Sequence, residues 1–425
     1  MNIRDRQILQ IAVPSIVSNI TVPLLGMIDV AIVGHMGSAV YIGAVAVGSM
    51  VFNLVYWLFG FLRMGTSGMT AQAYGRQNRE KTTGILVNAV LTAMAIAVTL
   101  IVLQTPLLWL MLRIIGPTPD VVPWATAYFR IVIWGAPASL MLFALTGWFI
   151  GMQDTRIPMT VSIMQNVVNI VASLTLVYAL GMKVEGVALG TVIAQYTALA
   201  VAVGFGLHKA GKIHLNRVSF GGRDFLTVNR DLFLRTLCLV AVNLYFTSAG
   251  ARQGAIILSV NTVLLQLYLL FSYFMDGFAY AGEALGGRYW GACNSGAFRE
   301  TLRRLFGWML VVTTVYTLLY IVGGMQIVAL LTDEQHVREA ARQYIGWAWF
   351  IPAAGCVAFI WDGVFVGITA TRGMLVSSFL AAALFFGVYG LTMGVLGNHG
   401  LWLAQVSYLA MRGIVQTVWY KKKYD

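Results

Sequence analysis

A single aspartate interrupts an apolar run near the start of the chain, and its setting points to proton or cation chemistry. The run reads Pro23-Leu-Leu-Gly-Met-Ile-Asp29-Val-Ala-Ile-Val-Gly34. An ionisable side chain at the centre of a bilayer costs about 2.5–3.5 kcal/mol on insertion scales, so such residues are rare and usually functional. Burial also disfavours the charged form, which suits a group that takes up and releases a proton. A structural hydrogen bond to a neighbouring helix is the alternative role for Asp29.

Three polar residues of a later apolar run, Asn166, Asn169 and Ser173, recur at intervals of three and four. This spacing places them on one face of a helix. Polar side chains on one stripe of a membrane-spanning helix turn towards other helices rather than lipid. Thr191, in the next run, extends the set. We expect these residues to be partners of Asp29, with helix packing through hydrogen bonds as the alternative.

Three other ionisable residues inside apolar runs are further candidates for function. Arg63 and Asp276 fall at nearly equivalent depths in the two halves if Met64 is aligned with Asp276, and we expect them to form a gating ion pair. Separate partners within each half are the alternative. Asp362 follows Trp361 and is a candidate for a second cation or substrate site. Such charges are retained in membrane segments mainly for function.

The candidate residues named above lie in apolar runs, and the composition of the chain indicates that these runs are membrane-spanning segments. Of 425 residues, 59% are hydrophobic and only 10% are charged, against about a quarter in soluble domains. This composition excludes an ordinary soluble enzyme and a disordered chain. The three cysteines are too widely spaced for a metal or redox motif.

Apolar runs of about 20 residues or more, the length that a spanning helix needs, occur twelve times. They lie near residues 7–34, 40–68, 84–112, 124–150, 157–180, 186–208, 231–252, 254–286, 303–331, 338–367, 373–396 and 400–419. The runs show no alternating period, which favours helices over a barrel. The sequence therefore predicts an all-α polytopic membrane protein with twelve transmembrane helices.

The basic residues indicate how these helices are oriented. Of the 28 Lys and Arg residues, 21 fall on one side of the predicted topology and 5 on the other, with Arg63 and Arg130 inside spans. Because basic residues accumulate in cytoplasmic loops, both termini are predicted to be cytoplasmic, in an inner (cytoplasmic) membrane. No basic segment is long or interleaved with aromatic residues, so we expect no binding of nucleic acid.

The two halves of the chain resemble each other. Gly147-Trp-Phe-Ile-Gly151 matches Gly363-Val-Phe-Val-Gly367 at an offset of 216, whereas Gly75-Arg76 matches Gly287-Arg288 at an offset of 212. We therefore predict two pseudo-symmetric six-helix lobes, residues 1–208 and 231–425, joined by a cytoplasmic linker at 209–230. Each lobe has an even number of spans, so the repeats are parallel, an arrangement suited to alternating access by rocking lobes.

The motifs of ATP hydrolysis and of the common hydrolases are absent from the sequence. We therefore expect no enzymatic activity and no cofactor. An ion gradient, in which each charge moved is worth about 2.3 kcal/mol per 100 mV, is the expected energy source.

Several of these motifs, taken in order, resemble the MATE (multidrug and toxic compound extrusion) family, and its DinF-like branch in particular. They are the stretch from Pro14 to Gly37, Phe61-Leu-Arg-Met64, Asp276-Gly-Phe-Ala-Tyr-Ala281 and Asp362-Gly-Val-Phe-Val-Gly367. The resemblance covers essentially the whole chain. It implies the MATE fold of the MOP superfamily and cation-coupled efflux of small organic, often cationic, substrates.

The resemblance also implies particular site residues. The cation-coupling set of the family maps onto Asp29, Asn169, Ser173 and Thr191. From the residues themselves, we expect substrate contacts at Asp29, Asn166, Asn169 and Asp362. Ser173 departs from the pattern, because many relatives carry aspartate there. A single carboxylate is a poor site for a hard cation, so we favour H⁺ as the coupling ion and keep Na⁺ at Asp29 as the alternative.

Other functions remain as alternatives. A flippase for lipids or lipid-linked sugars of the same superfamily would need several basic residues in its cleft, and Arg63 is the obvious candidate. A membrane-embedded transferase would need an acidic or histidine cluster such as Asp333, Glu334, His336 and Glu339, which a solvated helix start explains better. A passive channel is disfavoured by the two-lobe repeat. The expected partners are small organic molecules and membrane lipid, with the chain acting as a monomer.

Overall fold

The chain folds into α-helices. The computed structural model describes residues 2–34, 38–210 and 223–424, and across these ranges it contains no β-strand. The first half comprises α1 (Ile3–Gly34), α2 (Ala39–Leu58), α3 (Phe61–Gly75), α4 (Arg79–Val102), α5 (Gln104–Ile115), α6 (Val122–Val132), η1 (Ile133–Gly135), α7 (Ala136–Gly151), α8 (Arg156–Leu174), η2 (Thr175–Ala179) and α9 (Val184–Ala210). The second half comprises α10 (Arg223–Arg252), α11 (Ala255–Gly291), α12 (Ser295–Leu331), α13 (Gln335–Gly367), α14 (Thr371–Leu396) and α15 (Asn398–Tyr424).

Ten segments of the described chain are long and apolar enough to cross a membrane. They coincide with ten of the twelve predicted spans. The first and the last predicted spans, which lie on α1 and α15, are not among them. The last span falls short in hydropathy because Gln405, Arg412 and Gln416 lie within it, and all three side chains are buried. Their spacing of seven and four residues puts them on one face of α15, turned into the protein. The predicted all-α membrane fold is confirmed.

Some predicted spans consist of more than one helix. The predicted span 40–68 is α2 followed by α3, with a turn at Phe59 and Gly60 between them. The predicted span 124–150 contains the short 3₁₀ turn η1 between α6 and α7. The predicted linker 209–230 is helical from Arg223 onwards, and its residues 211–222 lie outside the described ranges. Apolar composition marks a span, but it does not reveal these interruptions.

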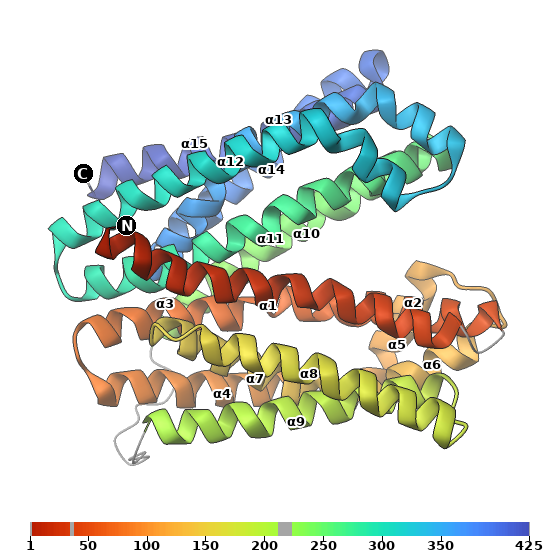
Figure 1. Cartoon of the computed structure of the whole chain (residues 1–425), viewed down its shortest axis with the longest axis horizontal. Helices are drawn as coiled ribbons and strands as arrows, with labels where there is room; N and C mark the ends of the chain where they lie inside the picture. The colour runs from red at the N-terminus through yellow and green to blue at the C-terminus, as the bar shows by residue number, and fades with distance from the viewer. Residues whose placement is uncertain (1, 35–37, 211–222, 425) are drawn as a thin grey trace. The chain divides into compact units, whose positions relative to one another are not determined.

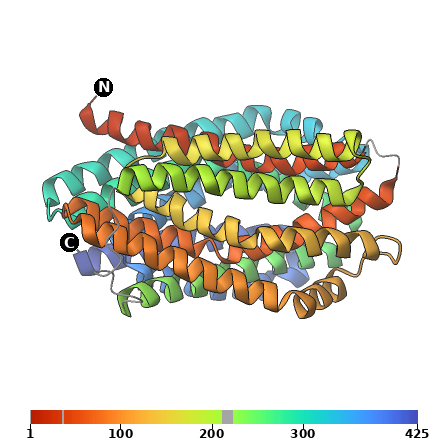
Figure 2. The ribbon, with the colours of Figure 1, turned by 90° about the horizontal axis from the view of Figure 1, so that it is seen from below.

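The chain divides into two compact units. One unit contains Pro14–Arg223, and the other contains Asp224–Asp425 together with Met1–Val13. In the first unit α8 and α9 run side by side, and in the second α11 and α13 do so (Figures 1 and 2). The start of α1 therefore packs with the second unit, whereas the rest of α1, including Asp29, belongs to the first.

Both ends of the chain lie at one end of the second unit. Near the N-terminus, Gln7 accepts a hydrogen bond from the Tyr289 hydroxyl at 3.0 Å. Near the C-terminus, the ring of Tyr424 packs edge-on against Trp290 with centroids 5.4 Å apart. Because Tyr289 and Trp290 are adjacent, the termini share one side, as an even number of spans requires.

The internal repeat holds in the backbone at one constant offset. Non-glycine residues with positive φ occur in pairs 216 residues apart, namely Gln77 with Cys293 and Gln153 with Thr369. Gly181 and Gly397, also 216 apart, both have positive φ. The N-cap side chains repeat as well, since Asn78 accepts from Lys81 N at 2.9 Å and Asn294 accepts from Ala297 N at 3.0 Å. These turns and caps connect equivalent helices in the two halves.

This constant offset changes one alignment made from the sequence. The Gly-Arg match at 212 places Met64 opposite Asp276, whereas the offset of 216 places Gly60 there. Gly60 lies in the turn between α2 and α3, but α11 continues unbroken through Asp276. Arg63 is therefore three positions beyond the equivalent of Asp276, which is about one helical turn.

Close helix packing explains why two glycines of the repeat are equivalent. A Cβ atom on Gly147 of α7 would overlap the carbonyl oxygen of Arg63 on α3. A Cβ atom on Gly363 of α13 would likewise overlap the carbonyl oxygen of Ala279 on α11. Small residues allow helix backbones to approach closely in membrane proteins, and the same contact is made in each half.

We predict that Gly363→Ala lowers the thermal stability of the purified protein, because overpacking a tight contact costs roughly 1–3 kcal/mol. Gly346→Ala on the same helix is the matched control, since a Cβ atom there meets nothing within 4 Å. The control should match or exceed the wild-type melting temperature, because alanine favours helix over glycine. Fluorescence-detected unfolding in detergent measures both. Equal melting temperatures for the two variants would contradict this packing.

Candidate functional site

Asp29 is buried inside the first unit. Its side chain lies on α1 and is only 5% exposed. Its Oδ1 atom makes no hydrogen bond within the described residues. The hydroxyl of Tyr128 on α6 lies within electrostatic range of Asp29 and faces both Thr191 and Ser49, with its oxygen 3.3 Å from Ser49 Oγ. A buried carboxyl oxygen without a donor disfavours negative charge.

The polar stripe on α8 faces α9, as its spacing predicts. Asn169 and Ser173 are fully buried. Asn169 donates from Nδ2 to Thr191 Oγ1 on α9 at 3.1 Å, and the Thr191 hydroxyl donates to the carbonyl of Val187 at 3.1 Å. The oxygens Asn169 Oδ1 and Ser173 Oγ make no hydrogen bond within the described residues. The structure thus brings Asn169 and Thr191 into direct contact.

Hydrogen bonds from α1 to α8 and to the following turn η2 show the level at which Asp29 lies. Asn166 donates from Nδ2 to the carbonyl of Thr21 at 3.0 Å, and the Tyr178 hydroxyl donates to the carbonyl of Ile32 at 3.4 Å. These pairs are separated by 145 and 146 residues, so the two segments run parallel in nearly constant register. That register places Asp29 near the level of the end of α8, the part of the helix that carries Ser173.

Local backbone features at this level are unusual. Directly after α8 the chain forms the π-helical turn η2, a conformation that is frequent at functional sites. A Cβ atom on Gly190 of α9 would overlap Ser173. Glycine at this position therefore allows α9 to approach the part of α8 that carries the polar residues.

The repeat supplies an independent view of the same cluster. At the offset of 216, Asp29, Asn169 and Ser173 correspond to Tyr245, Phe385 and Tyr389. These three aromatic residues are in contact: the Tyr245 ring lies 6.2 Å from Phe385 and 5.7 Å from Tyr389, centroid to centroid. The equivalent positions are thus polar in the first unit and aromatic in the second, where they form one cluster.

The second unit has a buried ionic cluster of its own around Asp362 on α13. Asp362 Oδ2 accepts from Arg235 on α10 and from Arg412 on α15. Asp362 Oδ1 accepts from Gln416 Nε2 at 2.6 Å. All four side chains are buried. Two guanidinium groups already neutralise this carboxylate, which works against its predicted use as a cation site.

The sequence reasoning misassigned two members of this cluster. Arg235 and Arg412 belong to the 21 basic residues that the predicted topology places on the cytoplasmic side, but they are 7% and 5% exposed within α10 and α15. Counting Lys and Arg by loop assigns a basic residue near the end of a span to the loop. Arg235 and Arg412 are instead buried and paired with the Asp362 carboxylate. The spacing of Arg412 and Gln416, one helical turn apart within an apolar run, is the signal that could have revealed them.

The remaining intramembrane charges fall in different units. Arg63 lies on α3 in the first unit, and Asp276 lies on α11 in the second. Their pairing stays a prediction. Glu283, also on α11, is only 1% exposed. Within the described ranges, no three His, Cys, Asp or Glu side chains gather as a metal site would require.

Comparison with known proteins identifies the family. The MatE family profile matches residues 14–175 and 232–389, which together span more than half of the chain. The chain belongs to the MatE family. The two matched stretches begin and end close to 216 residues apart, so the family pattern follows the internal repeat.

Individual relatives agree with this assignment. The chain is 38% identical over 426 residues to DNA damage-inducible protein F of Escherichia coli, covering 98% of this chain and 92% of the relative. It is 24% identical to the probable multidrug resistance protein NorM of Acinetobacter baylyi, covering 96% and 93%. A MATE crystal structure in the bent conformation superposes with a TM-score of 0.91 at 18% identity, covering 99% and 96%. The predicted DinF-like membership of the MATE family is confirmed.

We predict that Asp362→Asn destabilises the protein, because removing one partner of a buried ion pair costs roughly 3–5 kcal/mol. Two buried guanidinium groups would then lack their counter-charge. Adding Arg412→Gln to this variant removes one of them and should recover part of the loss. Thermal unfolding of the purified variants measures both effects. A melting temperature of Asp362→Asn equal to that of the wild type would show that the cluster does not stabilise this unit.

Proposed function

We propose that this MATE-family protein is a multidrug efflux antiporter that couples the export of small organic, often cationic, compounds to cation entry, with H⁺ as the coupling ion. The observation that carries the proposal is Asp29, a buried carboxyl group with an oxygen that lacks a hydrogen bond among the described residues. Family membership and similarity to a protein named for multidrug resistance support the transport role.

The chemistry of the site favours a proton over a metal ion. Asp29 is the only carboxylate of the proposed coupling set, and Asn169, Ser173 and Thr191 contribute neutral oxygens. Na⁺ and other hard cations are usually held by several oxygens, with carboxylates prominent among them. A protonated Asp29 would instead need one acceptor, and buried oxygens of Asn169 and Ser173 without partners are available at this level of α8.

Proton binding would act on α1 through its hydrogen bonds. The neutral acid donates a bond where the carboxylate only accepts, so protonation exchanges the partners of Asp29. Pro14 and Pro23 lie within α1, and proline in a helix interior removes a backbone bond and favours bending. A change at Asp29 would therefore be accommodated by bending α1. This bend would alternate access of the site between the two sides and release substrate outward.

The flippase alternative has less support from the basic residues of the chain. Such a protein would need basic residues free to bind a pyrophosphate group. The two buried arginines of the second unit, Arg235 and Arg412, both bond to Asp362. For this function, the pyrophosphate group would have to bind at Arg63.

We predict that Asp29→Asn leaves the protein folded in the membrane but reduces proton-driven drug efflux to the level of protein-free liposomes. Asparagine has nearly the same size as aspartate but carries no titratable proton. Asp333→Asn is the matched control, because the Asp333 side chain is fully exposed. Efflux from proteoliposomes is measured under imposed pH or Na⁺ gradients.

Three results decide this experiment. Loss of efflux in Asp29→Asn, with wild-type rates in the control, supports the proposed role. Wild-type efflux in Asp29→Asn would remove Asp29 from the mechanism. Efflux of the wild type under a Na⁺ gradient alone would overturn the choice of ion.

We also propose that Arg63 and Asp276 act as a gating pair. Arg63→Asp and Asp276→Arg should each reduce efflux, because a single reversal places like charges opposite each other. The double variant should recover part of the activity if the two side chains face each other, by the logic of a double-mutant cycle. Initial efflux rates of all four proteins test this pairing. Failure of the double variant to exceed either single variant would refute direct contact.

A further inference from the structure

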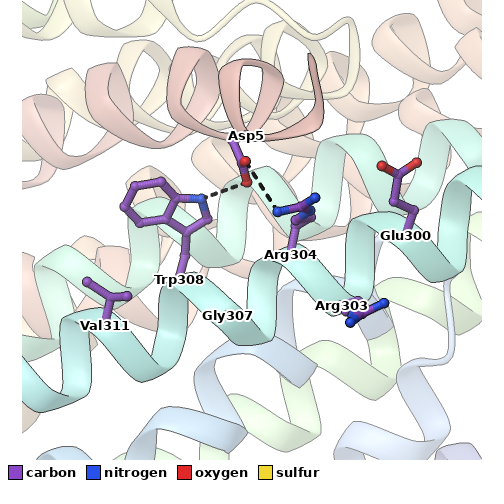
Figure 3. A pocket seen from close by; sticks show the side chains of 7 residues that line it. All are labelled: Asp5, Glu300, Arg303, Arg304, Gly307, Trp308 and Val311. Carbon is purple, nitrogen blue, oxygen red and sulfur yellow. Dashed lines mark hydrogen bonds and ion pairs between the residues drawn. The ribbon is translucent and has the colours of Figure 1, made fainter. Parts of the chain in front are cut away.

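A cavity of about 600 Å³ opens on α12 near the beginning of that helix. Its lining comes from one face of α12 and from the start of α1. The lining residues are Asp5, Glu300, Arg303, Arg304, Gly307, Trp308 and Val311 (Figure 3). All belong to the second unit. None takes part in the site proposed for transport.

The lining changes from charged to apolar along α12. Arg303 and Arg304 lie towards its beginning, Trp308 follows, and Val311 is 53% exposed one turn later. The helix has 37 residues, a length of about 55 Å at 1.5 Å per residue. The hydrocarbon core of a membrane, about 30 Å thick, is too thin to enclose the whole helix. From Trp308 to Leu331 the helix spans about 35 Å, so Trp308 falls at the membrane interface, where tryptophan is enriched.

The charges in the cavity leave one arginine available. Asp5 accepts a bond from Trp308 Nε1 at 3.2 Å and pairs with Arg304 at 3.5 Å. Glu300 pairs with Arg4 Nε at 3.3 Å. Arg303 makes no hydrogen bond or ion pair with the other residues drawn in Figure 3, and it is exposed. Counting Arg4 together with the lining, three arginines face two carboxylates, so one positive charge is left for a negative group.

We propose that this cavity binds the headgroup of an anionic phospholipid, with its phosphate on Arg303, beside Arg304, and an acyl chain along the exposed face of α12. The exposed apolar side chains beyond the cavity continue in that direction, with Leu310 at 60% and Val315 at 56%. A soluble phosphate would use only the charged half of the cavity. Basic pockets beside spanning helices on the cytoplasmic side are a known basis of recognition of anionic lipids.

Gly307 offers a way to block the cavity without disturbing the fold. A Cβ atom on Gly307 meets nothing within 4 Å, so Gly307→Leu places a side chain in open space between the charged and apolar halves. Asp5→Asn acts in the opposite direction, because it removes a negative charge while keeping an oxygen for Trp308. Arg79→Ala is the control for loss of one exposed basic residue, since Arg79 begins α4 and does not line the cavity.

The test is native mass spectrometry of the purified full chain titrated with dioleoylphosphatidylglycerol, with dioleoylphosphatidylcholine as the zwitterionic comparison. We expect the wild type to retain the anionic lipid in preference. Arg303→Ala should weaken retention about fivefold, the contribution of one basic residue near a membrane surface. Arg303→Lys should retain most of the binding. Gly307→Leu should also weaken it, Asp5→Asn should strengthen it, and Arg79→Ala should leave it unchanged.

Other results would overturn the proposal. Equal retention of the two lipids would refute recognition of a net negative headgroup. Displacement of the bound lipid by excess inorganic phosphate would indicate a soluble anion as the occupant. Retention unchanged in both Arg303→Ala and Gly307→Leu would remove the cavity as the binding site. A gain of binding in Asp5→Asn cannot arise from misfolding, so it supports the proposal even if another variant proves unstable.

Discussion

A carboxyl group inside a membrane-spanning helix must find its hydrogen bonds within the protein, because hydrocarbon offers none. The two units meet this constraint differently. Asp362 is bonded to two arginines and a glutamine. Asp29 is buried with an oxygen that has no partner in the described residues. A carboxylate whose oxygens are all hydrogen-bonded holds its helices in place. A carboxyl group with an unbonded oxygen can change its protonation state more readily. This contrast is why transport chemistry is proposed at Asp29.

The difference between Asp29 and Asp362 arises although the two halves of the chain repeat the same backbone structure. Turns, caps and glycine contacts recur 216 residues apart, so the backbone of one half is a good guide to the other. The side chains diverge at the candidate site positions, which are polar in the first unit and form an aromatic cluster in the second. Packing requirements preserve the backbone contacts, since a Cβ atom at a tight crossing has no space. Side chains that face an open or polar interior are free of that requirement.

Helix α1 belongs to both units. Its first residues bond to α11 and α12 in the second unit, and its later residues carry Asp29 and bond to α8 in the first. The change of unit occurs at Pro14. The same first residues border the cavity on α12, so a lipid bound there would contact the helix that carries Asp29, the proposed coupling residue.

The sequence by itself determined the membrane class, the positions of ten spans, the internal repeat and the family, and it singled out Asp29 as a candidate, because each depends on a local pattern. Long apolar runs and a rare charge within them are visible without knowing what they contact. Asn166, Asn169 and Ser173 were likewise found from helical spacing alone. Only the tertiary structure decided that Arg235 and Arg412 are buried partners of Asp362, at separations of 127 and 50 residues. It also decided the offset of 216 that realigns Asp276 with Gly60. Such pairings depend on which faces of distant helices turn towards each other, and packing settles this rather than local sequence.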